Sequence, residues 1–379
     1  METLGLIIGG ADRPASDDGS FDRRNPITGV LATRAAAATV DDAIAAVDAA
    51  AAAFPDWSQS SPRTRRDVLS GAADMLTDKM PLLINSMMDE TGATKDWAQF
   101  NVTFAADMLR EAAGLTTQIT GEVIPSNRPG TLAMAVRQPA GVVLSMAPWN
   151  APVILGVRAL AMPIACGNTV VMKTSEICPR THRLVVDALN EAGLPAGVLN
   201  AISNAHDDAP QIVEALIAQP AVRRVNFTGS TRVGRIIAEL TGRYLKPSLL
   251  ELGGKAPLIV LDDADIDAAV AAAAFGAFMN QGQICMATER VIVDDSLADQ
   301  FVAALVAKTK TLRAGDPLLG NTALGSVVDA SAAQRIGHLI KDATAKGAVL
   351  AVGVVIDGAI VHPTVLDRVT PQMRAYGDE

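Results

Sequence analysis

One of the three cysteines, Cys285, lies where its thiol can be reached by a substrate. It belongs to the stretch 280–290, between an apolar run with helical spacing that ends near Met279 and a β-rich run that begins at Arg290. Loops held between rigid elements often carry function, and an accessible thiol is a candidate nucleophile. A lone cysteine is also common as a small core hydrophobe, so this stretch alone leaves both interpretations open.

A base for such a thiol is more easily found among the carboxylates than among the histidines. The four histidines are scattered, without metal-ligand spacing and without an obvious link to Cys285: His182, His206, His338 and His362. Glu251 ends a predicted strand and is followed by two glycines, which favours a mobile general base. The plainer alternative is a strand-end charge paired with Lys255.

Two further polar stretches fit the parts of an adenine nucleotide. Glu176 follows a predicted strand, where a carboxylate can bind ribose hydroxyls and repel a 2′-phosphate, so it favours NAD over NADP. The stretch 229–234, Gly-Ser-Thr-Arg-Val-Gly, begins a predicted helix, and helix N-termini suit a pyrophosphate. Glu176 is otherwise an exposed loop acid, and Ser230 is otherwise an ordinary N-cap.

The elements that must position these residues alternate regularly between strands and helices. Strands are predicted near 141–146, 168–173, 198–202, 222–227 and 248–251, with helices at 153–164, 179–192, 209–218 and 232–240. Such alternation predicts an α/β fold with a parallel sheet covered on both faces. Ligands bind beyond the carboxyl ends of such strands, which is where the candidate residues lie.

The segments before and after these alternating strands and helices are predicted to form the rest of two domains and a hairpin. Helices with apolar residues at intervals of three and four begin at Val40 and at Ser61-Pro62. We predict an NAD-binding domain from residues 1–118 and 140–253, and an α/β catalytic domain from 254–379. Between them, 119–139 has strand periodicity around a turn, and we predict a protruding hairpin for oligomerisation.

Composition excludes several classes of function. The 379 residues carry a net charge of −9 and contain no basic run, which argues against nucleic-acid and anionic-membrane surfaces. The N-terminus lacks a signal-peptide pattern and apolar runs are too short for a membrane span, so we predict a cytoplasmic protein. Three widely spaced cysteines indicate neither a disulfide framework nor a zinc site.

Five motifs in register resemble the aldehyde dehydrogenase superfamily. They are Pro-Trp-Asn at 148–150, Lys-x-Ser-Glu at 173–176, Phe-Thr-Gly-Ser-Thr-x-x-Gly at 227–234, Glu-Leu-Gly-Gly-Lys at 251–255 and Gly-Gln-x-Cys at 282–285. The resemblance covers essentially the whole chain. It implies NAD-dependent oxidation of an aldehyde to a carboxylic acid through a cysteine thiohemiacetal and a thioester.

The resemblance assigns roles to the residues that match those motifs. Cys285 is similar to the nucleophile, Asn150 to the amide that holds the oxyanion, and Glu251 to the base that activates water. The cofactor contacts it implies are Lys173, Glu176, Gly229, Ser230, Pro148, Trp149 and Glu379. It implies no metal.

Two features depart from the family pattern. Thr174 replaces the usual proline after the lysine, and the chain ends at 377–379, where the family continues with Phe-Gly-Pro and further residues. We therefore expect a chain truncated at its C-terminus. This keeps open a non-catalytic NAD-binding or oligomerising fragment as the alternative function.

Within the superfamily, the likeness is greatest to the branch that acts on salicylaldehyde, vanillin and benzaldehyde. It predicts a hydroxylated aromatic aldehyde as substrate, with an aliphatic semialdehyde as the alternative. Arg158 on the helix after Asn150 is a candidate for the pocket mouth, or else a solvated arginine; Trp97 and Met162 are further candidates for the pocket wall. A homodimer or homotetramer is expected.

Overall fold

The computed structural model describes residues 3–320 and 322–378 and divides the chain into two compact units. Unit 1 contains residues 3–23, 33–83 and 100–251, and unit 2 contains residues 24–32, 84–99 and 252–378. Segments 24–32 and 84–99 therefore cluster with unit 2 although they come early in the chain. The functions predicted for the domains remain predictions.

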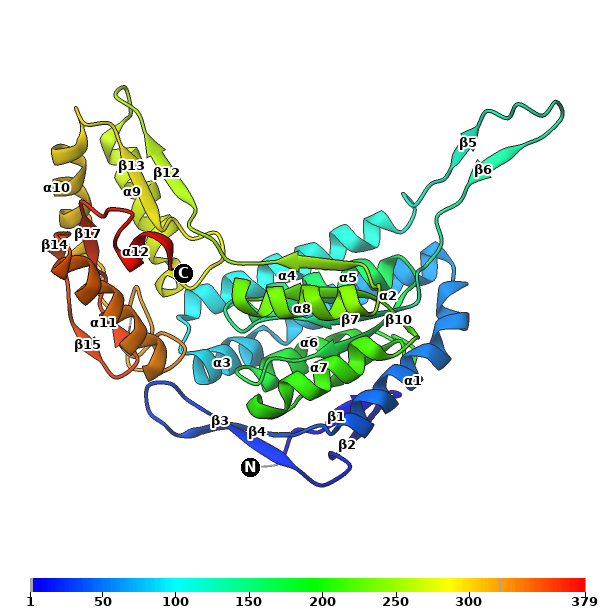
Figure 1. Ribbon diagram of the computed structural model, residues 1–379. Coiled ribbons are helices and arrows are strands. Elements are labelled where there is room, and N and C mark those ends of the chain that lie inside the picture. Colours follow the sequence, from blue (N-terminus) through cyan, green and yellow to red (C-terminus); the bar gives the residue numbers. More distant parts are fainter. Residues whose placement is uncertain (1–2, 321, 379) are drawn as a thin grey trace. The chain divides into compact units, whose positions relative to one another are not determined.

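Unit 1 is built on a seven-stranded sheet with the order β11-β10-β7-β8-β9-β1-β2 (Figure 1). The five strands from β11 to β9 are parallel, whereas β1 pairs antiparallel with both β9 and β2. The bounds are β1 Leu6–Ile8, β2 Ala11–Arg13, β7 Val142–Met146, β8 Thr169–Lys173, β9 Leu199–Ile202, β10 Val222–Thr228 and β11 Ser248–Glu251. The predicted parallel α/β sheet is confirmed.

Helices cover both faces of the centre of this sheet. Every residue of β7 and of β9 is buried, and because successive side chains point to opposite faces, both faces must be covered. Helix α1 packs on β8 and β9, α5 on β7 and β8, and α8 on β10 and β11. The helices of unit 1 are α1 Val40–Ser58, α2 Pro62–Asp78, most of α4 Lys95–Leu115, α5 Pro152–Ala165, α6 Pro179–Glu191, α7 Ala209–Ala218 and α8 Thr231–Arg243, with a 3-10 turn at His206–Asp208, whereas α3 Met80–Thr91 lies mostly in unit 2.

Local sequence explains where these helices begin. Thr39 and Asp42 form a capping box at the start of α1, each side chain bonding the backbone N–H of the other. Ser61 caps α2 by accepting the Thr64 N–H, and Pro62 occupies the first turn, where its missing N–H costs no bond. Both predicted starts are confirmed.

The predicted hairpin is present as β5 (Glu122–Ile124) and β6 (Ala133–Ala135), paired antiparallel with Glu122 opposite Ala135. It extends away from the rest of unit 1 (Figure 1). Val123 is 73% exposed and Met134 is 59% exposed, so apolar side chains stand in water along a strand pair with free edges. Its role in oligomerisation remains a prediction.

Unit 2 contains a second parallel strand pair, β12 with β13, with helices packed beside it. Phe301 and Leu305 of α10 pack with Val270 of α9 and Val260 of β12 in its core. The elements are β12 Pro257–Val260, α9 Ile266–Phe278, β13 Arg290–Val293, α10 Ala298–Thr309, α11 Ala330–Ala345, β14 Val349–Val352, β15 Ile356–Asp357, β16 Ile360–Val361, β17 Val365–Asp367 and α12 Arg374–Gly377. A further strand pair, β3 (Ser20–Arg24) with β4 (Leu31–Ala36), is connected by residues 25–30.

Membrane insertion receives no support from the helices. Across residues 3–320 and 322–378, none of them is both long and apolar enough to cross a bilayer.

Candidate active site

Four of the predicted site segments meet at the carboxyl edge of the unit 1 sheet. In the register of the parallel strands, Met146 pairs with both Lys173 and Phe227, and Thr228 pairs with Glu251. The ends of β11, β10, β7 and β8 therefore lie side by side. The segments 148–150, 173–176 and 229–230 and the residue Glu251 follow or form these ends, as the strand pattern predicts.

Asn150 lies between β7 and α5 and is half-buried. Its Oδ1 accepts the Ala151 N–H at 3.1 Å, just before Pro152 begins the helix. This bond engages the acceptor of the amide and orients the side chain, whose donor is the –NH2 group. Pro148 and Trp149, also half-buried, complete the connection.

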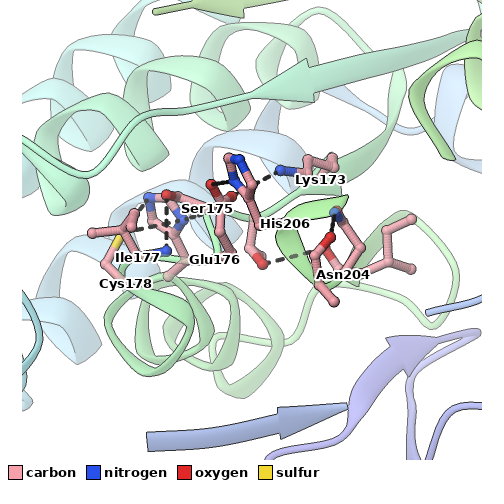
Figure 2. Close-up of polar contacts among 11 residues, drawn as sticks. Lys173, Ser175, Glu176, Ile177, Cys178, Asn204 and His206 are labelled. Carbon is pink, nitrogen blue, oxygen red and sulfur yellow. Dashed lines mark hydrogen bonds and ion pairs between the residues drawn. The ribbon is translucent and has the colours of Figure 1, made fainter. Parts of the chain in front are cut away.

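Glu176 is held between two basic side chains (Figure 2). Lys173 Nζ lies 3.2 Å from Oε2, and His206 Nδ1 lies 3.4 Å from Oε1. Burial alone would raise the pKa of Glu176, but the Lys173 charge and hydrogen bonds to the carboxylate outweigh it, so the pKa lies below its usual value. Glu176 is therefore ionised at neutral pH. His206 was not expected here, because the 3-10 turn that carries it is remote in sequence.

Arg158 contacts the predicted base. From helix α5 its Nη2 donates to Thr228 Oγ1 at 3.0 Å, and its Nη1 lies 3.9 Å from Glu251 Oε2. The alternative that pairs Glu251 with Lys255 is wrong, because Lys255 forms its ion pair with Glu289. Arg158 is thus a partner of the strand-end groups and not simply a solvated arginine.

The start of α8 shows why residues 229 and 230 have these identities. A Cβ at Gly229 would lie 2.4 Å from the Phe227 ring, so any larger residue would displace that ring. Ser230 Oγ accepts the Val233 N–H at 3.3 Å, which is the N-cap alternative considered for it. On helix α5, Met162, a candidate for the pocket wall, is 36% exposed.

In unit 2, Cys285 follows a turn with an unusual backbone. Asn280 (φ 48°), Gln281 (φ 57°) and Gly282 (φ 75°) are consecutive left-handed residues. Each non-glycine residue in this conformation costs on the order of 1–3 kcal/mol, so surrounding bonds must hold the turn. Cys285 itself is half-buried, and Trp97, also of unit 2, is buried.

Two glutamines tie this turn to the segment before α11. Gln281 Nε2 donates to the Ser326 carbonyl at 2.7 Å, and Gln283 Oε1 accepts the Val328 N–H at 2.9 Å. Neither anchor is predicted from the sequence, where Gln283 is part of the Gly-Gln-x-Cys motif and Gln281 directly precedes that motif. Two amide side chains close to a candidate nucleophile were the available signal. Glu379, a predicted cofactor contact, lies outside the described residues.

Comparison with known proteins identifies the family of the chain. Residues 13–379 match the family described as "Aldehyde dehydrogenase family". The chain belongs to the aldehyde dehydrogenase family. The predicted superfamily and the oxidation of an aldehyde with a nicotinamide cofactor are thereby confirmed, and the preference for NAD over NADP remains a prediction.

Individual relatives cover the whole chain. It is 62% identical to a vanillin dehydrogenase of Pseudomonas fluorescens over 379 residues, 100% of this chain and 78% of the relative. It is 51% identical to a salicylaldehyde dehydrogenase of Pseudomonas putida over 375 residues, 99% of this chain and 78% of the relative. The crystal structure of a salicylaldehyde dehydrogenase from Pseudomonas putida G7 complexed with salicylaldehyde matches with a TM-score of 0.98 at 49% identity, covering 100% of this chain and 78% of that one.

Proposed function

We propose that the protein oxidises an aromatic aldehyde that carries a hydroxyl substituent, of the vanillin or salicylaldehyde type, to its carboxylic acid with NAD. The observation that carries the proposal is the strand-end set of Asn150, Glu176 and Glu251 in a chain 62% identical to a vanillin dehydrogenase. An aliphatic semialdehyde is the alternative substrate that the experiment below must exclude.

The residues of this chain divide the chemistry as follows. The Cys285 thiolate adds to the aldehyde carbon and forms a C–S bond, while the carbonyl π-pair moves to oxygen. The Asn150 amide and the Cys285 N–H stabilise that oxyanion, an interaction typically worth about 2.7–4 kcal/mol per donor. When bound, NAD supplies the acceptor for the hydride whose loss turns the Cys285 adduct into a thioester.

Glu251 then completes the turnover. As general base it removes a proton from water, whose oxygen attacks the thioester carbon; the C–S bond breaks, and the thiolate and the carboxylic acid are released. Its place at the end of β11, on the same edge of the sheet as the segment that carries Asn150, supports this role.

The residues at the ends of β8 and β10 fit the cofactor. An ionised, partly buried Glu176 suits ribose hydroxyls and disfavours a 2′-phosphate, which supports NAD over NADP. The N-terminal amides of α8 after Gly229 suit a pyrophosphate, and Lys173, Ser230, Pro148 and Trp149 are assigned to the same site. Glu379 keeps its assignment by resemblance only.

For the substrate pocket we assign Arg158, Trp97 and Met162. The Arg158 guanidinium offers several donors to a phenol oxygen, which a lysine ammonium reproduces poorly. The hairpin of β5 and β6 is assigned to contact between copies of the chain in a homodimer or homotetramer. We also assign the protein to the cytoplasm, residues 1–118 and 140–253 to NAD binding, and residues 254–379 to catalysis.

The test is NADH absorbance with vanillin, salicylaldehyde, benzaldehyde and a short aliphatic semialdehyde. We expect the hydroxylated aromatic aldehydes to have the highest kcat/KM, and Arg158→Lys to raise KM for vanillin more than for benzaldehyde. No NADH with any aldehyde would refute the activity. A preference for the semialdehyde would refute only the aromatic assignment.

A further inference from the structure

A histidine with no part in the chemistry above lies fully buried in unit 1. His182 is on α6, and its ring packs beside Gly156 of α5, where a built Cβ would lie 3.5 Å from the ring Cδ2, an ordinary van der Waals distance. A buried imidazole must have both ring nitrogens satisfied, because an unpaired buried polar group is costly. The partners of the two nitrogens therefore show what the residue holds.

On one side the ring accepts a hydrogen bond. The Ser175 N–H donates to His182 Nδ1 at 3.1 Å. A nitrogen that accepts carries no proton, so the proton of the neutral ring is on Nε2. Ser175 belongs to the loop after β8, directly between Lys173 and Glu176.

On the other side the ring can only donate. The backbones of Pro148 and Pro152 also hydrogen-bond the ring. Proline has no N–H, so its backbone offers only a carbonyl oxygen, which matches a protonated Nε2. These two prolines bracket Asn150 in the connection between β7 and α5.

We propose that His182 is a positioning residue that fastens the loop carrying Asn150 to the loop carrying Glu176, through one neutral ring that accepts from the second and donates to the first. The inference rests on the roles proposed for Asn150 and Glu176. It adds that the oxyanion amide and the ribose carboxylate are oriented by a shared contact.

A catalytic role for this histidine is not supported. Cys178 Sγ lies 3.8 Å from each ring nitrogen, but both side chains are fully buried and no substrate reaches them. Burial, with the Lys173 charge, lowers the pKa of His182 to about 3, so the ring remains neutral at the pH of the reaction and keeps the single tautomer that the two bonds need.

The experiment replaces one side of the ring at a time. In His182→Leu both bonds are lost. In His182→Asn the side-chain oxygen takes the place of Nδ1 and can still accept from Ser175, whereas in His182→Gln the side-chain nitrogen takes the place of Nε2 and can still donate to the proline carbonyls. Leu189→Ala, a buried change on the same helix, controls for general loss of packing.

The readouts are the rate of the first NADH turnover at saturating NAD, which reports the Asn150 side, and the dissociation constant of NAD, which reports the Glu176 side. Because small displacements of positioned groups cost on the order of 100-fold, we expect His182→Leu to lose at least about 10-fold in rate and to weaken NAD binding. We expect His182→Asn to restore mainly NAD binding and His182→Gln mainly the rate.

Two results would overturn the proposal. One is that His182→Leu lowers the unfolding temperature as Leu189→Ala does but leaves both readouts unchanged; the other is that all three His182 variants behave alike. Nitrogen NMR of ring-labelled histidine gives a separate check, since a proton on Nδ1 would refute the assigned bonds whatever the activity. A failure of the proposed function would give a different result: Asn150→Ala would form NADH in the first turnover as fast as the wild type does.

Discussion

The buried ring of His182 makes the stability of the protein depend on acid. The pKa of this side chain falls from 6.5 to about 3 in the folded state, first because of burial and then because of the Lys173 charge. Between these values the unfolded chain binds a proton that the folded chain does not. Stability is therefore complete above about pH 6.5 and is lost progressively as the pH falls toward 3.

The size of the effect follows from the two pKa values. When the unfolded chain binds one proton more than the folded chain, each pH unit changes the free energy of unfolding by about 1.4 kcal/mol. At pH 5 the unfolded histidine is protonated and lies about 1.5 pH units below its pKa, whereas the folded ring is still neutral, so the free energy of unfolding falls by about 2 kcal/mol relative to pH 7. At pH 4 the loss from this one group reaches about 3 kcal/mol.

The assay is urea unfolding of the wild type and His182→Gln, at one protein concentration and at both pH 7 and pH 5. Glutamine does not titrate, so we expect the wild type to lose about 2 kcal/mol relative to this variant on acidification. His182→Asn also lacks a titrating group, so the wild type should lose the same free energy of unfolding relative to this variant between pH 7 and pH 5. A difference between wild type and variants that is independent of pH would show that the ring is not held neutral, and would refute the reasoning.

Four further predictions test the site. Cys285→Ala should abolish NADH formation, checked by absorbance; residual turnover near the wild-type rate would exclude Cys285 as nucleophile. Glu251→Gln should slow thioester hydrolysis more than hydride transfer, so stopped-flow should show a surviving burst of NADH, and equal loss of both steps would count against the base. Glu176→Gln removes a charge that repels the 2′-phosphate, so kcat/KM for NADP relative to NAD should rise by about 10-fold, the equivalent of about 1.4 kcal/mol; an unchanged ratio would refute its role in selectivity. Met134→Asp on the hairpin should lower the apparent mass in size-exclusion chromatography, and an unchanged mass would place the contact between copies elsewhere.

Much of the fold is encoded in local pattern. The alternation of apolar runs with short polar turns predicted the parallel strands β7 to β11 and their intervening helices, because buried strands and amphipathic helices each impose their own spacing on apolar residues. The helix starts at Val40 and at Ser61-Pro62 were also predicted, since helix initiation depends on residues within one turn. The same holds for the strand-end positions of Lys173 and Glu251.

The pairings between those strand ends were decided by tertiary structure. Sequence proximity favoured Lys255 as the partner of Glu251, but Arg158 takes that place because α5 follows β7, which is separated from β11 only by β10. His206 reaches Glu176 for the same kind of reason, as β8 and β9 are neighbours whose ends align.

The family, the order of strands and helices along the chain, and the chemical character of the edge at which the parallel strands end all follow from the sequence. The contacts of His182, a histidine outside any motif, with the loops that carry Asn150 and Glu176 follow from the three-dimensional fold. Hydrophobic spacing reports that a side chain is buried, but the partners of a buried polar group come from segments remote in the chain, and sheet order and crossovers bring them together.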